Sequence, residues 1–401
     1  MINSNCSIHV VTGSFPARSQ TFVQNHVCGM ASRGWYVSTL ASNVELGMTS
    51  DELDAIDNLG VQRNYWGAWS SNRFKRLIQM VGYMLFTPAT IRYWNGQGPW
   101  ARSEMLEARR MCDYLKSNEV KKIHVHFGHT AAFLAAIGWD KPTVVTWHGY
   151  DANMLTTSRG DAIYRELFER DWKHTVGSSF MQRRLIELGA RKEQVFKIPM
   201  GIDLSCFQFV DRSSRVQNTI KLVSIGRLDE MKGHSYLIDA VCEVKNLGID
   251  LKLNIIGEGP ARKELESQIQ KKGLEENVAL LGSRPPSYVR DELAASDIFA
   301  LTGVVALSGR VETQGVAFIE AQATGLPVIG SDVGGVSESM LPDTTGILVK
   351  PKDVSAIAEA IATYADNREL RLAHGRAGSD FVRDRFNIDT MLESFEKLYQ
   401  S

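Results

Sequence analysis

The chain is predicted to fold as an α/β protein with two doubly wound domains. Short runs of β-branched and aliphatic residues alternate with helical periodicity over nearly all of its 401 residues. This alternation is typical of parallel sheets built from strand–helix–strand units. The runs form two series, separated by the Pro-Met-Gly-Ile-Asp stretch at residues 199–203. Proline and glycine interrupt regular structure there, so each series is expected to form its own sheet.

Each series contains six predicted strands with amphipathic helices between them. One such helix is expected at Thr21–Ser32, with Ser19 as its N-cap and Gly34 after its end. A break in the helical C-terminal segment is expected at Phe386-Asn387. The strands of the first series are Ile8–Val11, Val37–Leu40, Lys122–Val125, Val144–Trp147, Thr175–Val176 and Val195–Ile198. Those of the second are Leu222–Ile225, Lys252–Ile256, Ala279–Leu281, Ile298–Leu301, Pro327–Ile329 and Ile347–Val349.

The composition excludes several classes of protein. A net charge of −1 gives no overall attraction to nucleic acid. The five cysteines are scattered, without the spacing of a metal site or a disulfide framework, which fits a reducing compartment. The N-terminal residues lack the basic and apolar parts of a signal peptide, and no run approaches the roughly 20 apolar residues of a spanning helix. We therefore expect a cytoplasmic globular protein that does not bind nucleic acid.

Two cations follow a predicted strand of the second series. Ligands of open α/β sheets bind where the strands end, so polar residues at these points are candidates for a site. Arg227 follows the strand Leu222–Ile225 after one glycine, and Lys232 opens the next helix. A guanidinium fork, an ammonium group and the free amides of a helix start together suit a diphosphate. The alternative interpretation is an ordinary surface arginine and lysine in a loop.

Two glutamates separated by seven residues follow another strand of the same series. Glu312 comes after the strand Ile298–Leu301, and Glu320 lies two turns into a helix expected at Gln314–Thr324. Carboxylates accept hydrogen bonds from vicinal hydroxyls, so the pair suits a hexose and a ribose. Taken alone, two solvated glutamates would be the simpler interpretation. The cations at a corresponding strand end favour a site for a sugar nucleotide.

These motifs resemble the family 4 glycosyltransferases of the GT-B fold. The resemblance rests on the Gly-Arg-Leu turn with Lys232-Gly233, the Glu-x7-Glu pair and the Ala-Gln-Ala-Thr-Gly-Leu-Pro-Val that follows, and it covers most of the second half. It implies two Rossmann-like domains facing a cleft. Residues 1–200 would bind the acceptor and residues 201–385 the nucleotide sugar. A C-terminal helix at residues 386–401 would pack back on the first domain.

The resemblance also implies roles for individual residues. Arg227 and Lys232 match the residues that hold the donor diphosphate, Glu312 the one that contacts the transferred sugar, and Glu320 the one that binds the ribose. The family more often has Glu-Gly-Phe-Gly where this chain has Glu-Thr-Gln-Gly, so its sugar pocket is expected to differ. The further expected donor-binding residues are Gly13, Ser14, Glu258, Arg284, Gln314, Gly315 and Val316. The loop around Glu258 contains only a partial GxGxxG, which is a weak signal by itself.

The first half contains two more turns that match the family. Phe-Pro-Ala-Arg-Ser-Gln-Thr-Phe at residues 15–22 is similar to the Phe-Pro-x-x-Ser-Glu-Thr-Phe of exopolysaccharide-type members, which implicates Ser19 and Gln20 in acceptor binding. His148-Gly-Tyr-Asp151 matches the His-Gly-x-Asp turn, in which the histidine contacts the donor hexose. Asp151 is expected to position the acceptor. The alternatives are a helix cap at Ser19 and a structural histidine at a strand end.

No metal or other cofactor is expected. His124, His126 and His129 lie within six residues, but only the first two share a strand face and no carboxylate stands nearby. There is also no Asp-x-Asp pair of the kind that metal-dependent glycosyltransferases use.

Residues 63–110 combine aromatic rings with basic side chains. An apolar stripe at helical spacing runs through them, formed by Phe74, Leu77, Ile78, Val81 and Leu85. Such a stripe beside cations suits a membrane interface or a lipid-phosphate acceptor. Packing of the stripe on the first sheet is the interpretation that we favour slightly, because apolar stripes on helices are more often core.

The sequence thus predicts a retaining, metal-independent hexosyltransferase with catalytic residues His148, Arg227, Lys232 and Glu312. Its donor is expected to be a UDP- or GDP-sugar. Its acceptor is expected to be a lipid-diphosphate-linked sugar of bacterial exopolysaccharide biosynthesis, reached peripherally at the inner face of the plasma membrane. The alternatives are a soluble small-molecule acceptor, a sugar-nucleotide epimerase or hydrolase, a pyridoxal-phosphate phosphorylase, for which no lysine motif is evident, and a non-catalytic sugar-binding relative.

Overall fold

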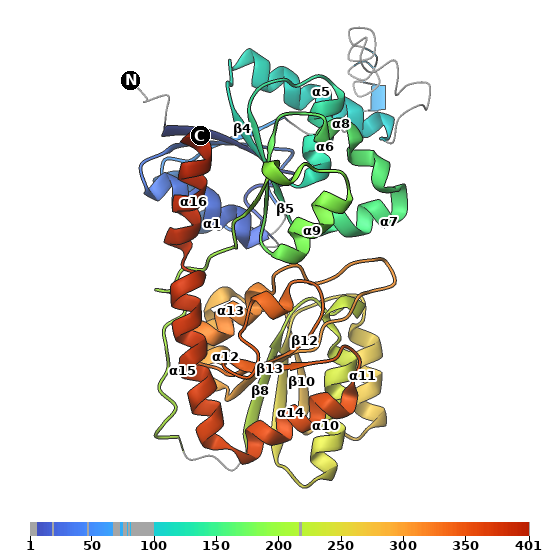
Figure 1. The fold of residues 1–401 in the computed structure, drawn as a ribbon, viewed down its shortest axis with the longest axis vertical. Coiled ribbons are helices and arrows are strands. Elements are labelled where there is room, and N and C mark those ends of the chain that lie inside the picture. The colour runs from blue at the N-terminus through green and yellow to red at the C-terminus, as the bar shows by residue number, and fades with distance from the viewer. Residues whose placement is uncertain are drawn as a thin grey trace. The chain divides into compact units, whose positions relative to one another are not determined.

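The computed structural model describes residues 6–400 except 18–19, 46–47, 67–72, 75–77, 79–80, 82–99 and 216–218. The chain divides into two compact units (Figure 1). The first contains Met1–Gly177, Met181–Ile198 and Leu392–Ser401, and the second contains Ser178–Phe180 and Pro199–Met391. In the part of the chain described, no helix has both the length and the apolar character needed to cross a bilayer.

The first unit is built on a parallel sheet of seven strands in the order β3-β2-β1-β4-β5-β6-β7. Six of these strands are those predicted. The strand β3 was missed because Gln-Arg-Asn-Tyr forms no apolar run; it lies at the sheet edge, where its side chains are not fully buried. The strands are β1 (Ser7–Val11), β2 (Tyr36–Ala41), β3 (Gln62–Tyr65), β4 (Ile123–His126), β5 (Thr143–Trp147), β6 (Lys173–Val176) and β7 (Val195–Lys197).

Helices connect these strands, and the predicted helix at Thr21–Ser32 is present with those bounds as α1. Its N-cap is Gln20, whose side chain makes no capping bond, and Ser19 lies outside the described residues. The cap expected at Ser19 was therefore placed one residue too early. Among the described residues, the other helices of this unit are α2 (Ser50–Asn58), α5 (Arg102–Ser117), α6 (Gly128–Ala136), α7 (Leu155–Arg159), α8 (Arg165–Phe168) and α9 (Ser179–Glu187), whose first two residues belong to the second unit.

The C-terminal helix α16 (Ile388–Gln400) returns to the first unit. Leu392 packs against Gly29 of α1 so closely that an added Cβ at the glycine would lie 2.6 Å from Leu392 Cδ1. Glu396 accepts hydrogen bonds from Arg33 Nε at 3.1 Å and from Trp35 Nε1 at 2.9 Å. Residues 386–391 belong to the second unit, so the unit boundary lies within α16 rather than before it. The predicted break at Phe386-Asn387 is confirmed, since α15 ends at Arg385.

The second unit contains a parallel sheet of six strands in the order β10-β9-β8-β11-β12-β13, and all six were predicted. The strands are β8 (Ile220–Ile225), β9 (Leu251–Ile256), β10 (Val278–Gly282), β11 (Ile298–Leu301), β12 (Val328–Ser331) and β13 (Gly346–Val349). The helices are α10 (His234–Asn246), α11 (Arg262–Lys271), α12 (Pro286–Ala295), α13 (Val316–Ala323), α14 (Val354–Asp366) and α15 (Arg368–Arg385).

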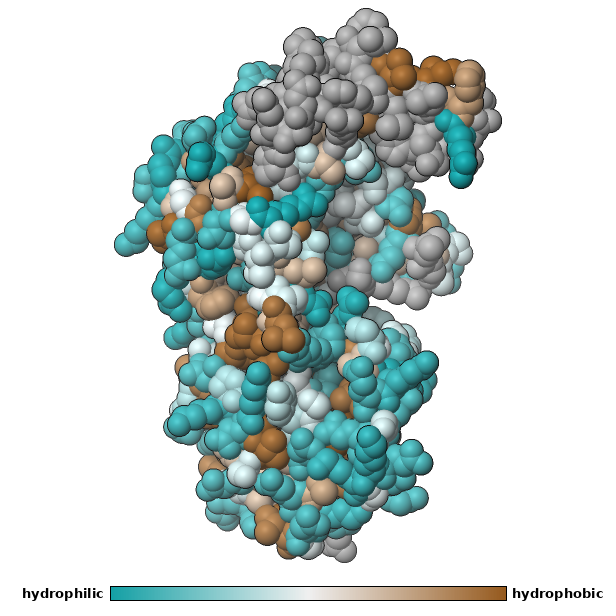
Figure 2. All heavy atoms as spheres, turned by 90° about the vertical axis from the view of Figure 1, so that its right-hand side faces the viewer, coloured by the Kyte–Doolittle hydropathy of each residue, from teal (hydrophilic) through white to brown (hydrophobic). Residues whose placement is uncertain are grey.

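Helices cover both faces of the second sheet. Side chains alternate along each strand, so Leu222 packs with α10, α11 and α14, whereas the next residue, Val223, packs with α12 and α13. Burial on both faces explains why these strands read as continuous apolar runs in the sequence. On the face drawn in Figure 2, the coloured residues are mostly hydrophilic, with apolar side chains gathered in a few patches.

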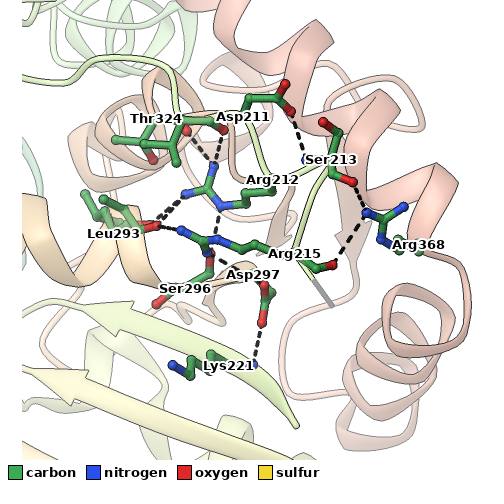
Figure 3. A network of polar contacts seen from close by, with 12 residues as sticks. Asp211, Arg212, Ser213, Arg215, Lys221, Leu293, Ser296, Asp297, Thr324 and Arg368 are labelled. Carbon is green, nitrogen blue, oxygen red and sulfur yellow. Dashed lines mark hydrogen bonds and ion pairs between the residues drawn. The ribbon is translucent and has the colours of Figure 1, made fainter. Parts of the chain in front are cut away.

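Arginines of the segment at residues 211–215 donate hydrogen bonds to carbonyls at the carboxyl ends of nearby helices (Figure 3). The buried guanidinium of Arg212 donates to the carbonyls of Leu293 at 2.9 Å and Ser296 at 2.8 Å, at the end of α12. It also donates to the carbonyl of Thr324, just after α13, at 2.6 Å. A cation is favourable there because it meets the negative end of the helix dipole. Burial and the nearby Arg215 lower the pKa of Arg212 to about 10, so it is charged at neutral pH.

Replacing Arg212 by alanine should lower the free energy of unfolding by about 2–4 kcal/mol, because buried carbonyls lose their donors. Urea unfolding followed by circular dichroism measures this change. The matched control is Arg376→Ala in the same unit. It removes an exposed ion pair in which Arg376 Nη2 lies 4.0 Å from Asp211 Oδ1. It should change stability by less than about 0.5 kcal/mol. Equal effects of the two substitutions would contradict the capping role of Arg212.

Candidate functional site

The candidate donor site lies in the loops that follow β8, β11 and β12. The loop after β8 contains a short 3-10 turn at Glu230–Lys232. Gly233, the N-cap of α10, then adopts the left-handed conformation at φ 66°. An added Cβ at Gly233 would lie 1.8 Å from the carbonyl oxygen of Thr302, just after β11. Only glycine therefore allows these two loops to touch, and this contact fixes the position of Lys232.

Lys232 and Glu312 form an ion pair across these loops, with Nζ 2.5 Å from Oε2. Both side chains are mostly buried. Burial raises the pKa of Glu312, but Lys232 and the amides of Gly315 and Thr313 outweigh it and hold the pKa below its usual value. The carboxylate is therefore ionised at neutral pH. The two residues with predicted diphosphate and sugar roles are in direct contact.

Backbone contacts with the loop after β12 fix the position of Glu312. The amide of Gly335 donates to the carbonyl of Glu312 at 2.9 Å, and the amide of Gly315 donates to its carboxylate at 3.2 Å. An added Cβ would lie 1.9 Å from the Glu312 carbonyl oxygen if placed on Gly334. On Gly335 it would lie 2.0 Å from the carbonyl oxygen of Thr313. Glycine at both positions therefore allows the close backbone contacts that support Glu312.

Asp229 pairs with two arginines beside the ion pair of Lys232 and Glu312. Its side chain is 4% exposed, and its Oδ2 lies 2.6 Å from Arg310 Nη2 and 3.7 Å from Arg227 Nε. Its Oδ1 is buried without a hydrogen-bond partner among the residues that the structure describes. Arg227 is 63% exposed and can reach a ligand. The sequence reasoning missed Arg310, although a cation two residues before Glu312 was a usable signal.

Glu320 lies in α13, two turns after Glu312. The helix is shorter than the predicted Gln314–Thr324, because Gly315 adopts the left-handed conformation at φ 76° and Val316 is its first residue. Glu320 is partly exposed, and burial raises its pKa to about 7.

The side chains of the remaining expected donor-binding residues, Gln314, Glu258 and Arg284, contact other protein groups. The side-chain amide of Gln314 pairs with the backbone of Met200, accepting from its amide at 2.8 Å and donating to its carbonyl at 2.9 Å. Only the backbone of Gln314 is therefore available to a ligand. Glu258 is exposed and pairs with Arg262 at 2.8 Å. Arg284 is exposed and lies over the ring of Tyr288, 5.0 Å from its centroid.

His148 follows β5 in the first unit and lies against aromatic rings. Its centroid is 4.1 Å from that of Phe22 and 4.7 Å from that of Phe127, and its Nε2 lies 3.0 Å from His126 Nδ1. Burial, with a smaller effect of His26, lowers the pKa of His148 to about 3. The imidazole is therefore neutral at physiological pH.

Asp151 has a structural position that the sequence reasoning did not anticipate. It is fully buried, and its carboxylate accepts from four backbone amides at 2.7–3.2 Å. Burial raises its pKa to about 6, although these hydrogen bonds act in the opposite direction. The carboxylate holds the turn after His148 and does not reach the surface. Direct contact with an acceptor is not available to it in this structure.

The loop after β1 holds the other residues expected at the site. Ser14 Oγ donates to Asn43 at 2.9 Å, and Thr12 Oγ1 donates to the side chain of Gln20 at 3.3 Å. An added Cβ at the exposed Gly13 would meet no atom within 4 Å. Packing within the described residues thus does not require glycine at position 13, whereas close approach of a ligand would.

The histidines group differently from the prediction. The ring nitrogens of His124 and His126 lie with those of His26, within 4.8 Å of one another, in a group that could hold a metal ion. His129 instead lies beside the rings of Phe133 and Tyr150. His26 comes from α1, about a hundred residues earlier, so sequence proximity gave no sign of it.

Two family models match the chain. Residues 19–205 match the one described as Glycosyltransferase Family 4, and residues 208–381 match Glycosyl transferases group 1. With its two parallel sheets and the site at a strand-end edge, the chain belongs to the family 4 glycosyltransferases and has the GT-B fold.

Known proteins agree with this assignment. WcaL from Escherichia coli, named as a colanic acid biosynthesis glycosyltransferase, is 27% identical over 96% of this chain and 98% of its own length. AmsK from Erwinia amylovora, an amylovoran biosynthesis glycosyltransferase, is 28% identical over 91% of this chain and 90% of its own. The crystal structure of HepE from Anabaena with UDP and glucose aligns with a TM-score of 0.74 at 16% identity, covering 99% of both chains.

Glu320 should make stability depend on pH. Its folded pKa of about 7 lies above the usual 4.5, so its contribution to stability is present below pH 4.5 and is lost as the pH rises through 7. Glu320→Gln should therefore be more stable than the parent protein at pH 8, by up to about 2 kcal/mol, and equal to it at pH 4. Urea unfolding at both pH values measures this. The exposed Glu359→Gln should show no such pH dependence; the same null result for Glu320→Gln would contradict the prediction.

Proposed function

We propose that this chain transfers a hexose from a UDP- or GDP-sugar to a sugar acceptor, with retention of anomeric configuration and without a metal ion. The observation that carries this proposal is the ion pair between Lys232 and Glu312 at the strand-end edge of the second sheet. In a nucleotide sugar, the hexose is joined directly to the diphosphate. A cation for phosphate and a carboxylate for hydroxyls must then stand side by side, as these two do.

Three cations are placed to balance the diphosphate charge. Lys232 would exchange part of its contact with Glu312 for a phosphate oxygen. Arg227 is exposed and only loosely paired, so it can turn toward the ligand at little cost. Arg310 contacts the loop after β8 by its ion pair with Asp229. Fixed cations stabilise the charge that grows on a leaving group, and these three supply that stabilisation without a metal.

The sugars would then lie along the start of α13. Glu312 accepts hydrogen bonds from the hexose, and Glu320 accepts them from the ribose. The backbone amides of Gln314, Gly315 and Val316 lie at the positive end of this helix and are assigned to the donor, and the amide of Gly315 also donates to Glu312. Glu258 and Arg284, in loops after the neighbouring strands β9 and β10, are assigned to the base side. Gly13 and Ser14 are assigned to close approach to the sugar phosphate.

The reaction proposed is a front-face displacement. The acceptor hydroxyl attacks the anomeric carbon from the side on which the diphosphate leaves. The bond from that carbon to the phosphate oxygen breaks, its electron pair goes to the diphosphate, and a phosphate oxygen takes the hydroxyl proton. Neutral His148 contacts the hexose by hydrogen bonding. A covalent intermediate on Glu312 is the alternative, and inversion of the anomeric centre in the product would contradict both.

The acceptor proposed is a lipid-diphosphate-linked sugar, met at the cytoplasmic face of a membrane. WcaL and AmsK are named for the biosynthesis of two polysaccharides, which favours a growing glycan as acceptor.

Phe74, Ile78 and Val81 are 70%, 58% and 41% exposed at helical spacing. The packing of the stripe on the first sheet, which we favoured slightly, does not hold for these three residues. Leu77 and Leu85 lie outside the described residues. Ser19 and Gln20 are assigned to the acceptor sugar, and Asp151 to holding the turn of His148.

The donor test uses thermal unfolding with a panel of UDP- and GDP-sugars, each with and without EDTA. A donor at a hundred times its Kd should stabilise the protein by about 2.7 kcal/mol, and EDTA should not change the shift. Lys232→Met should weaken binding about 30- to 100-fold, which is about 2–3 kcal/mol. The control Lys263→Met removes an exposed lysine of α11. Undiminished binding by Lys232→Met would contradict the proposal, and donor turnover without any sugar acceptor would indicate a hydrolase or epimerase.

The membrane test uses flotation with liposomes that contain anionic lipid. Replacing Phe74 and Ile78 together by serine should reduce the bound fraction at least about threefold, because two exposed apolar anchors are lost. The matched control is Leu247→Ser, since Leu247 is 69% exposed in the second unit. If the parent protein ignores liposomes and turns over a water-soluble acceptor, the soluble-acceptor alternative replaces this part of the proposal.

A further inference from the structure

Four histidines of the first unit form one continuous hydrogen-bonded series. His148 Nε2 lies 3.0 Å from His126 Nδ1, and His126 Nε2 lies 3.0 Å from His26 Nδ1. His26 Nε2 lies 2.8 Å from the hydroxyl of Tyr399, which belongs to α16. The series therefore joins the histidine of the candidate site to the C-terminal helix.

The series continues on the other side of Tyr399. The same hydroxyl contacts His124 Nδ1, and His124 Nε2 lies 2.7 Å from Thr146 Oγ1. Thr146 Oγ1 lies 2.5 Å from Thr175 Oγ1. Each member is a hydroxyl or an imidazole, so each can both donate and accept. The direction of any one hydrogen bond therefore constrains the direction of the next.

The four imidazoles are neutral at physiological pH. Burial lowers the pKa of His26 and His148 to about 3. Burial also lowers the pKa of His124 and His126 well below the ordinary value, and the neighbouring imidazoles lower it further. A neutral imidazole carries one N–H, so each ring donates from one nitrogen and accepts at the other.

Counting hydrogens leaves two arrangements for the whole series. If Tyr399 donates to His26 Nε2, the protons of His26, His126 and His148 must all sit on Nδ1. His124 must then donate to Tyr399 from its own Nδ1. If Tyr399 donates to His124 instead, all four protons sit on Nε2. In either arrangement, the four histidines share one tautomer.

We propose that Tyr399, His26 and His126 are positioning residues that set the tautomer and ring orientation of His148. The hydroxyl of Tyr399 decides the direction of the series, and the direction decides which nitrogen of His148 carries the proton. The consequence for catalysis rests on the proposed contact of His148 with the donor hexose, because a sugar hydroxyl meets either an N–H or a lone pair there. The hydrogen-bonded series itself does not depend on that function.

The position of Tyr399 is fixed by the helix that carries it. Its carbonyl accepts from Lys122 Nζ at 2.8 Å, and its ring lies 5.5 Å from that of Trp35. One turn earlier, Glu396 accepts from Arg33 and Trp35. Tyr399 is thus held at its ring, its backbone and the preceding turn, so its hydroxyl has little freedom to leave the histidines.

A metal ion is the competing occupant of the same cluster. His26, His124 and His126 could ligate one, but each of their six ring nitrogens already lies within hydrogen-bond distance of a partner in the series. A bound metal would have to displace several of these contacts. The hydrogen-bonded series accounts for the geometry with the protein groups alone.

The test is long-range proton–nitrogen NMR of the full chain labelled at histidine nitrogen, with each histidine assigned by substitution. The expected result is that His26, His124, His126 and His148 are neutral and share one tautomer. Different tautomers among the four, or a charged ring at neutral pH, would overturn the proposal. So would a stoichiometric metal found by elemental analysis of the purified protein.

Two variants test the control by Tyr399. Tyr399→Phe should leave the fold intact, introduce the second tautomer at His148, and lower kcat about tenfold with KM for the donor within twofold. His26→Gln breaks the series at another point and should give the same signature at His148. The matched control is Tyr364→Phe, which removes a buried hydroxyl 2.8 Å from His374 in the second unit. It should leave the His148 signals unchanged.

The outcomes separate this inference from the proposed function. Unchanged His148 signals in Tyr399→Phe would overturn the positioning role, even if Lys232→Met loses donor binding as expected. A changed tautomer at His148 in a protein that transfers no sugar would uphold the series and reject the function.

Discussion

The candidate donor site depends on close contacts between glycines and the backbones of neighbouring loops. Gly233 touches the loop after β11, and Gly334 and Gly335 touch the loop that carries Glu312. No side chain larger than hydrogen fits at these points. The loops are therefore held by backbone atoms, which have fewer ways to move than side chains have. Lys232 and Glu312 meet because the backbones that carry them are fixed at these contacts.

Each of the three cations at this edge already faces a carboxylate of the protein, although three cations share only two carboxylates. Lys232 is neutralised by Glu312, and Asp229 binds two arginines. A diphosphate must therefore compete with carboxylates that are already in place, and the affinity gained is a difference between two sets of contacts. In return, the mostly buried Lys232 has a carboxylate partner before a donor binds, and leaving it unpaired would cost several kcal/mol. In the proposed reaction, the carboxylate that releases Lys232 becomes free to accept a hydrogen bond from the hexose.

The sequence predicts well those features that depend on local patterns. Twelve strands could be placed because strands buried on both faces are continuous apolar runs, whereas the polar edge strand β3 could not. Motif spacing located Arg227, Lys232 and Glu312 in loops after strands of one sheet, and Glu320 in the helix that follows Glu312. Features that depend on contacts across the chain were missed. Asp151 was expected to position the acceptor, but four backbone amides enclose its carboxylate. His26 joins His126 across a hundred residues, and Arg310 meets Asp229 across eighty-one. No local pattern encodes these pairs.

The return of α16 to the first unit has a consequence for biosynthesis. The ribosome completes residues 199–391, and with them the second unit, before it adds the residues that contact α1 and the histidines. At about 5–20 residues per second, this delay lasts about 10–40 s. During that time the nascent first unit lacks Leu392, Glu396 and Tyr399, so part of its apolar surface and its buried imidazoles remain open to water or to a chaperone. Although its strands are made first, the first unit can be completed only after residues 392–401 have been made.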